Sequence, residues 1–215
     1  MSIQNIVWDW NGTIVNDAQV FVDTMNFLLA SESLPLTHLQ DYRQNFVFPV
    51  EQYWKHLGFS LNTKEFNKKN SLFIKQYQKN MFVPLLHPGI KKLIGLLNAE
   101  KIRQFVLSAS ENSLLQQSIK HYKLTSLFVD CFGVKNLNAK GKELLGKKLF
   151  KKHFLNNKKT LLIGDTEYDA RVADALGCPV VLVSYGHINH NRLSKTNKTV
   201  VASVKELSDF IFSNQ

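Results

Sequence analysis

The chain has 215 residues and is 44% hydrophobic, which fits one globular core with a smaller unit inserted in it. Its two cysteines exclude a disulfide framework. The chain has no signal-peptide pattern and no apolar run near the roughly 20 residues that span a bilayer. These features predict a cytoplasmic protein with no membrane partner. The net charge of +10 favours anionic partners. The densest run of lysines comprises Lys147, Lys148, Lys151 and Lys152. It lacks the interleaved aromatic residues of a nucleic-acid-binding surface, so we interpret it as a solvated helix face.

The first predicted element is a buried strand at Ile3–Trp8, because this run is apolar without the alternation of a half-exposed strand. A long helical region follows it. Apolar residues recur there at helical spacing on both sides of a break that contains Pro49 and Gly58: Phe21, Met25 and Leu28 before the break, and Phe66, Phe73 and Tyr77 after it.

Helices and strands alternate from His87 onward. Residues 90–97 and 115–122 have helical spacing, and strand-like apolar runs lie at residues 105–107, 127–129, 160–163 and 179–183. This alternation predicts an α/β fold, a Rossmann-like parallel sheet with helices on both faces. Because residues 16–85 interrupt it with helices alone, we expect a core domain of residues 1–15 and 86–215 with an inserted helical cap of residues 16–85.

Polar residues follow three of the predicted strands. Asp9 follows the first strand, Ser108 follows the strand at 105–107, and Asp165 follows the strand at 160–163, with Asp169 four residues later. Taken singly, each has a structural explanation as a turn or helix-capping residue. Because ligands bind at the carboxyl ends of strands in open parallel sheets, their joint order predicts a site at this edge.

Four segments occur in a fixed order along the chain: DWNGT at residues 9–13, Ser108, a lysine near Lys142, and GDTEYD at residues 164–169. They resemble the four motifs of the haloacid dehalogenase superfamily of phosphohydrolases. More narrowly, the chain is similar to the phosphoglycolate-phosphatase-like members, which insert a helical cap just after the first motif. The resemblance covers essentially the whole chain.

The resemblance implies that Asp9 is a nucleophile that forms an aspartyl-phosphate. Because this carboxylate and the phosphate are both anions, it also implies a Mg²⁺ cofactor, an ion that prefers oxygen ligands. Asp9, the main-chain carbonyl of Asn11 and Asp165 would supply the protein's oxygens. Asp169 would bind the ion directly or hold a metal-bound water.

Phosphate binding falls, by the same resemblance, to the hydroxyl of Ser108 and to nearby main-chain N–H groups, those of Ala109, Gly12 and Thr13. A lysine must oppose the negative charge as a compact cation. Lys142 is preferred, because it begins the stretch KELLG that best matches the family's lysine segment, and Lys140 is the alternative.

Asn11 departs from the family pattern. The position two after the nucleophile is usually an aspartate, which protonates the leaving group and then activates water. A carboxamide does neither near neutral pH, and general acid–base catalysis typically contributes about 10²–10⁴-fold. We therefore expect narrowed or slowed phosphatase chemistry that still accepts good leaving groups such as those of acyl or aryl phosphates. A cap residue or His187 acting as the base, or deamidation of Asn11, are alternatives.

Arg43 is the only arginine of the predicted cap and has two interpretations. It is either a planar donor fork for a substrate carboxylate or second phosphate, or an ordinary surface side chain.

The predicted function is a magnesium-dependent phosphomonoester hydrolase for a small phosphorylated metabolite such as phosphoglycolate. A phosphotransferase or mutase is one rival, in which the phosphoryl group of Asp9 passes to a second substrate. A catalytically weak protein that binds a phosphate ligand is the other, suggested by Asn11.

Overall fold

The computed structural model describes residues 3–60, 62–135 and 141–214. In these residues, six strands form one parallel sheet in the order β3-β2-β1-β4-β5-β6. The strands are β1 (Asn5–Trp8), β2 (Arg103–Glu111), β3 (Asp130–Val134), β4 (Thr160–Gly164), β5 (Val180–Val183) and β6 (Thr199–Val201). The α-helices are α1 (Ala18–Ser31), α2 (Leu39–Asn45), α3 (Val50–His56), α4 (Thr63–Asn80), α5 (Ile90–Ala99), α6 (Asn112–His121), α7 (Lys142–His153), α8 (Glu167–Leu176), α9 (His190–Leu193) and α10 (Val204–Ser213).

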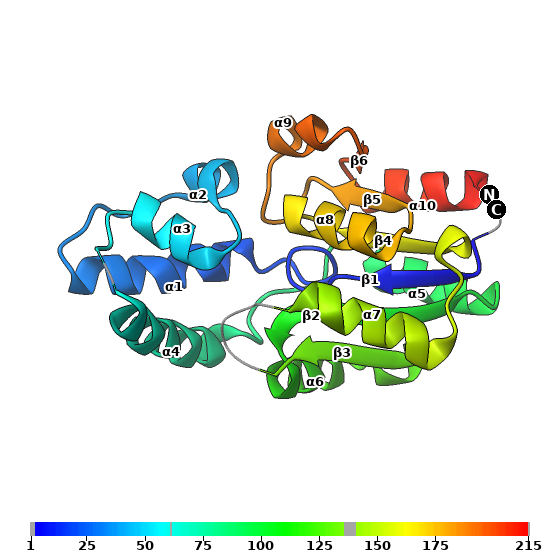
Figure 1. Cartoon of the computed structure of the whole chain (residues 1–215), viewed down its shortest axis with the longest axis horizontal. Coiled ribbons are helices and arrows are strands. Elements are labelled where there is room, and N and C mark those ends of the chain that lie inside the picture. Colours follow the sequence, from blue (N-terminus) through cyan, green and yellow to red (C-terminus); the bar gives the residue numbers. More distant parts are fainter. Residues whose placement is uncertain (1–2, 61, 136–140, 215) are drawn as a thin grey trace.

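Helices cover both faces of the sheet (Figure 1). Successive residues of a strand point to opposite faces, so the apolar strands supply two separate cores. Phe105 and Leu162 belong to the core beneath α7 and α8. Ile6 and Val106 belong to the other core, with α5, α6 and α10. The predicted α/β fold with helices on both faces is therefore confirmed.

Apart from shifts of one or two residues at strand ends, the strands differ from the sequence prediction in three respects. The strand expected at 127–129 is wrong, because Thr125–Leu127 forms a 3-10 turn and β3 begins at Asp130. The β2 strand continues past Ser108 to Glu111, which pairs with Val134 after a shift of register. The short β6 strand was not predicted, since its three residues form no longer apolar run.

The helices α1 to α4 lie beyond the carboxyl end of β1 (Figure 1). Val15 and Leu86 form an antiparallel bridge, and the N–H of Asn16 donates to the carbonyl of Leu85 at 2.9 Å. The chain therefore leaves and rejoins the sheet at adjacent points. These junctions coincide with the predicted boundaries at residues 15/16 and 85/86, while the division into a core and a cap stays a prediction.

The dense lysine run lies along α7, where Lys147, Lys148, Lys151 and Lys152 are all exposed, as expected for a solvated helix face. Among the described helices, none is both long enough and apolar enough to cross a bilayer.

Candidate active site

Three carboxylates meet at the carboxyl edge of the sheet. Asp9 follows β1 and Asp165 follows the neighbouring strand β4, while Asp169 lies in the first turn of α8. All three are buried, and one ligand oxygen from each lies within 4.8 Å of the other two. The structure therefore brings together the acidic residues that the sequence indicates as metal ligands.

Lys142 balances part of this negative charge. Its Nζ donates to Oδ1 of Asp9 at 2.5 Å and to Oδ1 of Asp169 at 2.6 Å. Lys142 is the first residue of α7, where the positive end of the helix dipole disfavours a cation, so the carboxylates account for its position better than the helix does. Burial alone would lower the pKa of Lys142, but Asp169 and Asp9 raise it, so the side chain is charged. Lys140, the alternative, lies outside the described residues.

One lysine leaves the carboxylate cluster with excess negative charge. Burial raises the pKa of Asp9 to about 6, with Lys142 opposing and Asp169 adding to the shift. Burial also raises the pKa of Asp165 to about 8, opposed by His187 and reinforced by the charges of Asp9 and Asp169. Hard oxygen ligands with unbalanced charge are what Mg²⁺ prefers. The residues present therefore fit this ion.

The excess charge predicts that stability depends jointly on Mg²⁺ and pH. The raised pKa values of Asp9 and Asp165 exceed the ordinary value of 3.8, so both groups destabilise the fold as pH rises from about 4 to 8. Mg²⁺ at 100 times its Kd should contribute about 2.7 kcal/mol, or roughly 5–10 °C in Tm. The increase should be larger at pH 8 than at pH 5, where protons already neutralise both groups. Thermal denaturation with and without Mg²⁺ measures this, and equal shifts at both pH values would contradict it.

Asp165 is held by the two loops that pass over it. The hydroxyl of Thr13 donates to its Oδ1 at 3.3 Å, and the N–H of His187 donates to its Oδ2 at 2.6 Å. A Cβ atom at Gly12 would lie 2.1 Å from that Oδ2, and one at Gly186 would lie 2.2 Å from it. Both glycines are therefore required by the close approach of the backbone to this carboxylate.

The predicted phosphate donors divide into two groups. The N–H of Gly12 already donates to the carbonyl of Val15 at 2.9 Å and to Oδ1 of Asp17 at 2.8 Å, and the hydroxyl of Thr13 is bonded to Asp165. Protein atoms therefore occupy the N–H of Gly12, which does not support Gly12 as a phosphate donor. The bond of the Thr13 hydroxyl does not involve the main-chain N–H of Thr13, whose predicted role stays a prediction.

Ser108 and Ala109, by contrast, line the pocket that also contains Asp9. The hydroxyl of Ser108 accepts a bond from the N–H of Ser110 at 3.0 Å, which leaves its own proton available for a phosphoryl oxygen.

Asn11 is fixed by three side-chain hydrogen bonds. Its Nδ2 donates to Oδ2 of Asp17 at 2.5 Å and to the hydroxyl of Tyr77 at 3.0 Å, and the hydroxyl of Ser110 donates to its Oδ1 at 2.6 Å. The Tyr77 hydroxyl in turn donates to Oδ2 of Asp17 at 2.8 Å. The amide thus serves as a donor to a fully buried carboxylate.

Asp17 and Tyr77 were missed by sequence reasoning. Asp17 directly precedes α1, where an aspartate signals a helix cap, but its side chain makes no capping bond and turns toward Asn11 instead. The helical spacing of Tyr77 in α4 predicts only that it lies on the apolar face of that helix. It does not indicate that the hydroxyl contacts the segment at residues 9–13.

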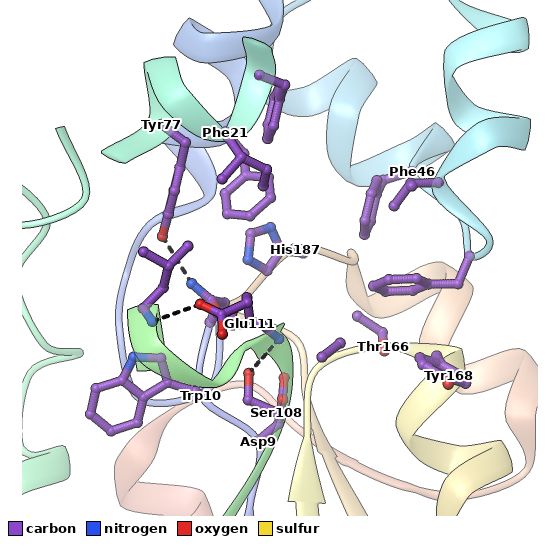
Figure 2. A pocket seen from close by; sticks show the side chains of 18 of the residues that line it. Asp9, Trp10, Phe21, Phe46, Tyr77, Ser108, Glu111, Thr166, Tyr168 and His187 are labelled. Carbon is purple, nitrogen blue, oxygen red and sulfur yellow. Dashed lines mark hydrogen bonds between the residues drawn. The ribbon is translucent and has the colours of Figure 1, made fainter. Parts of the chain in front are cut away.

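His187, the alternative base, has both ring nitrogens near protein partners. Its Nδ1 bonds the hydroxyl of Tyr42 at 2.7 Å, and its Nε2 lies 3.3 Å from Oδ1 of Asp17 without hydrogen-bond geometry. Burial opposes protonation of the ring, but Asp17 and Asp165 raise its pKa. The ring lines the pocket (Figure 2).

Arg43 is not brought to the predicted site. It lies in the last turn of α2, and its Nη2 donates to the carbonyl of Tyr185 in the loop after β5 at 2.9 Å. Its side chain is not among those that line the pocket. The predicted donor fork for a substrate is therefore not supported, because the guanidinium serves a contact between the helical region and the core.

The chain matches a sequence model of haloacid dehalogenase-like hydrolases over residues 6–183, from β1 to the end of β5. It belongs to this family. The matched range of this haloacid dehalogenase-like hydrolase contains the whole carboxylate cluster and Lys142. A comparison with curated proteins finds no match.

Solved structures share the fold of this haloacid dehalogenase-like chain. A predicted phosphatase from Clostridium acetobutylicum has 21% identity and a TM-score of 0.81, with 99% of this chain and 100% of that chain covered. A predicted phosphoglycolate phosphatase from Haemophilus somnus has 21% identity and a TM-score of 0.80, with 100% and 99% covered. Protein Tyrosine Kinase A from Mycobacterium tuberculosis has 19% identity and a TM-score of 0.81, with 98% of each chain covered. At these identities the likeness is one of fold.

Proposed function

We propose that this haloacid dehalogenase-like hydrolase is a magnesium-dependent phosphomonoester hydrolase that acts through an aspartyl-phosphate on Asp9. The main support is the buried cluster of Asp9, Asp165 and Asp169 with Lys142 bonded between two of them. Ser108 lines the same pocket. The site thus combines a nucleophile, oxygen ligands for a cation and a hydrogen-bond donor for the phosphate.

Each of these side chains has a part in the proposed reaction. Asp9 attacks phosphorus, Lys142 keeps it ionised and opposes the phosphoryl charge, and Ser108 donates to a phosphoryl oxygen. Mg²⁺ would be held by Asp9, Asp165 and the main-chain carbonyl of Asn11, with Asp169 as a ligand or holding a water, and would neutralise phosphoryl charge. Residues 16–85 would act as a cap that excludes water.

The proposal also includes the kind of substrate and a cytoplasmic location. A small phosphorylated metabolite is proposed, and phosphoglycolate, named for the Haemophilus protein, is the first compound to assay. Both cysteines, Cys131 and Cys178, are free thiols, as expected in a reducing cytoplasm.

The role of Lys142 gives a direct test. Lys142→Ala should lower kcat/KM for phosphate esters by about 10³-fold, because Asp9 and the bound phosphate lose their fixed cation. Lys147→Ala, an exposed lysine of the same helix, is the matched control and should leave the rate unchanged. Full turnover in Lys142→Ala with loss in Lys140→Ala would assign the role to Lys140.

Phosphotransfer is the second candidate, favoured by the bonding of Asn11. Because its amide cannot activate water, an aspartyl-phosphate would persist long enough to pass to an acceptor. Transfer to added alcohols that outpaces phosphate release would identify this activity. Absence of turnover across a panel of phosphate esters and acyl phosphates would instead favour a protein that only binds phosphate ligands.

A further inference from the structure

The wall of the pocket that faces the carboxylates is apolar. Its side chains come from residues 16–85 and, apart from Asn70, are aromatic, aliphatic or methionine, as with Phe21, Phe46 and Met25. No charged side chain of residues 16–60 or 62–85 lines the pocket. Phe21 and Phe46 lie across the pocket from Asp9 and Ser108 (Figure 2). The space beyond a phosphate on Asp9 is therefore an aromatic chamber, defined by Phe21, Phe46 and Phe73.

Of the three tyrosines on this wall of the pocket, Tyr42 and Tyr77 have hydroxyls that are bonded to protein, whereas the buried hydroxyl of Tyr53 has no hydrogen-bond partner among the described residues. The hydroxyl of Tyr42 bonds Nδ1 of His187 at 2.7 Å, and that of Tyr77 donates to Asp17 at 2.8 Å. Their rings therefore present carbon to a ligand, which favours an apolar group on it.

Among the residues that the structure describes, the pocket has no cationic side chain free to pair with an acidic substrate. Among the described residues, its cationic side chains are Lys142, bonded to Asp9 and Asp169, and His187, which lies beside Asp17. Arg43 does not line the pocket, and its Nη2 donates to the carbonyl of Tyr185. A carboxylate such as that of phosphoglycolate would be desolvated there without a partner and near other carboxylates, which is unfavourable. An uncharged ring would be favoured.

The leaving oxygen is also constrained. The amide of Asn11 cannot transfer a proton near neutral pH, and the carboxylate of Glu111 accepts the N–H groups of Ser113 and Leu114 at the start of α6. The ring nitrogens of His187 face the hydroxyl of Tyr42 and the carboxylate of Asp17. A leaving group that departs as an anion must therefore be weakly basic. A phenol has a pKa of about 10. The pKa of an aliphatic alcohol is closer to that of water, which is about 15.7.

Resting on the function proposed above, we propose that the substrates are phosphate monoesters of phenols, with the uncharged ring in the aromatic chamber. An oxygen of Asp9 attacks phosphorus, the bond from phosphorus to the phenolic oxygen breaks, and the phenoxide leaves with the electron pair and takes a proton from water. A water then attacks the phosphorus of the aspartyl-phosphate. The bond to Asp9 breaks, its carboxylate is restored, and both protons of this water remain on the released phosphate.

Four substrates, assayed with Mg²⁺, distinguish the effect of an aromatic ring on the rate from the effect of a good leaving group. Phenyl phosphate has both features, benzyl phosphate keeps the ring on an aliphatic oxygen, phosphoglycolate has neither, and acetyl phosphate has a good leaving group without a ring. We expect kcat/KM for phenyl phosphate to exceed that for benzyl phosphate at least 100-fold and that for phosphoglycolate by more. Equal values for phenyl and benzyl phosphate, or a higher value for phosphoglycolate, would overturn the inference while leaving the phosphatase proposal intact.

If the phosphatase proposal itself were wrong, the result would differ, because acetyl phosphate would then also remain uncleaved.

The chamber is tested by Phe21→Ala, which should lower the ratio of kcat/KM for phenyl phosphate to that for acetyl phosphate about tenfold. Phe27→Ala is the matched control on the same helix, because Phe27 is 48% exposed and outside the pocket. The same ratio in both variants would overturn the role of the chamber, and circular dichroism checks that each is folded.

Discussion

Asp9→Asn is expected to abolish phosphate-ester turnover while leaving the protein folded. Removal of the nucleophile should reduce kcat/KM by at least about 10⁴-fold, which corresponds to roughly 5 kcal/mol of barrier. The substitution is isosteric, and Lys142 keeps Asp169 as a partner at 2.6 Å. Because burial raises the pKa of Asp9, a neutral amide should not destabilise the fold and should raise the Tm at pH 8 without Mg²⁺.

The two measurements together distinguish a lost nucleophile from a damaged fold. Asp23→Asn serves as the control, because Asp23 is an exposed residue of α1 and its substitution should change neither rate nor Tm. Turnover by Asp9→Asn within tenfold of the wild-type rate would remove Asp9 from the role proposed for it.

Asn11→Asp is the second change with a large expected effect. It places a carboxyl group where an amide donates to Asp17 at 2.5 Å, so a buried hydrogen bond becomes a contact between two acids. The free energy of unfolding should fall by about 2–3 kcal/mol, or roughly 4–12 °C in Tm. The negative charge of Asp17 should also raise the pKa of the introduced acid, which favours the protonated form that a general acid needs.

The gain in rate should therefore depend on the leaving group. We expect kcat/KM for benzyl phosphate to rise about 10²–10³-fold in Asn11→Asp, whereas that for phenyl phosphate changes little because phenoxide leaves without protonation. Asn16→Asp makes the same substitution at an exposed site nearby and should show neither effect. An unchanged ratio of the two substrates would show that proton transfer at residue 11 is not what limits the wild-type enzyme.

The strands that carry the carboxylates could be predicted because each is a short apolar run that ends at an acidic residue. Asp9 and Asp165 follow β1 and β4, which are neighbours in the sheet, so predicting the strands also placed these side chains together. Strand β3 could not be placed correctly, since the apolar residues at 127–129 do not distinguish a strand from a 3-10 turn that leads into one.

Contacts between distant segments were beyond sequence reasoning. The network around Asn11 joins Asp17 to Tyr77, 60 positions apart, and periodicity predicts only that Tyr77 is buried. Arg43 was a reasonable candidate for a substrate contact because of its residue type. Its bond to the carbonyl of Tyr185 depends on how α2 packs against the loop after β5, which local patterns do not encode.

The proposed mechanism requires phosphorylation of Asp9. The reaction with phenyl phosphate and Mg²⁺ should be stopped with acid during steady-state turnover, and the digested protein examined by mass spectrometry. Because Asn11 cannot activate water, the aspartyl-phosphate should accumulate, and we expect one phosphoryl group on the peptide that contains Asp9 and none in Asp9→Asn. Continued phosphate release with no phosphoryl group on Asp9, or with the group on Ser108 instead, would contradict the proposed mechanism.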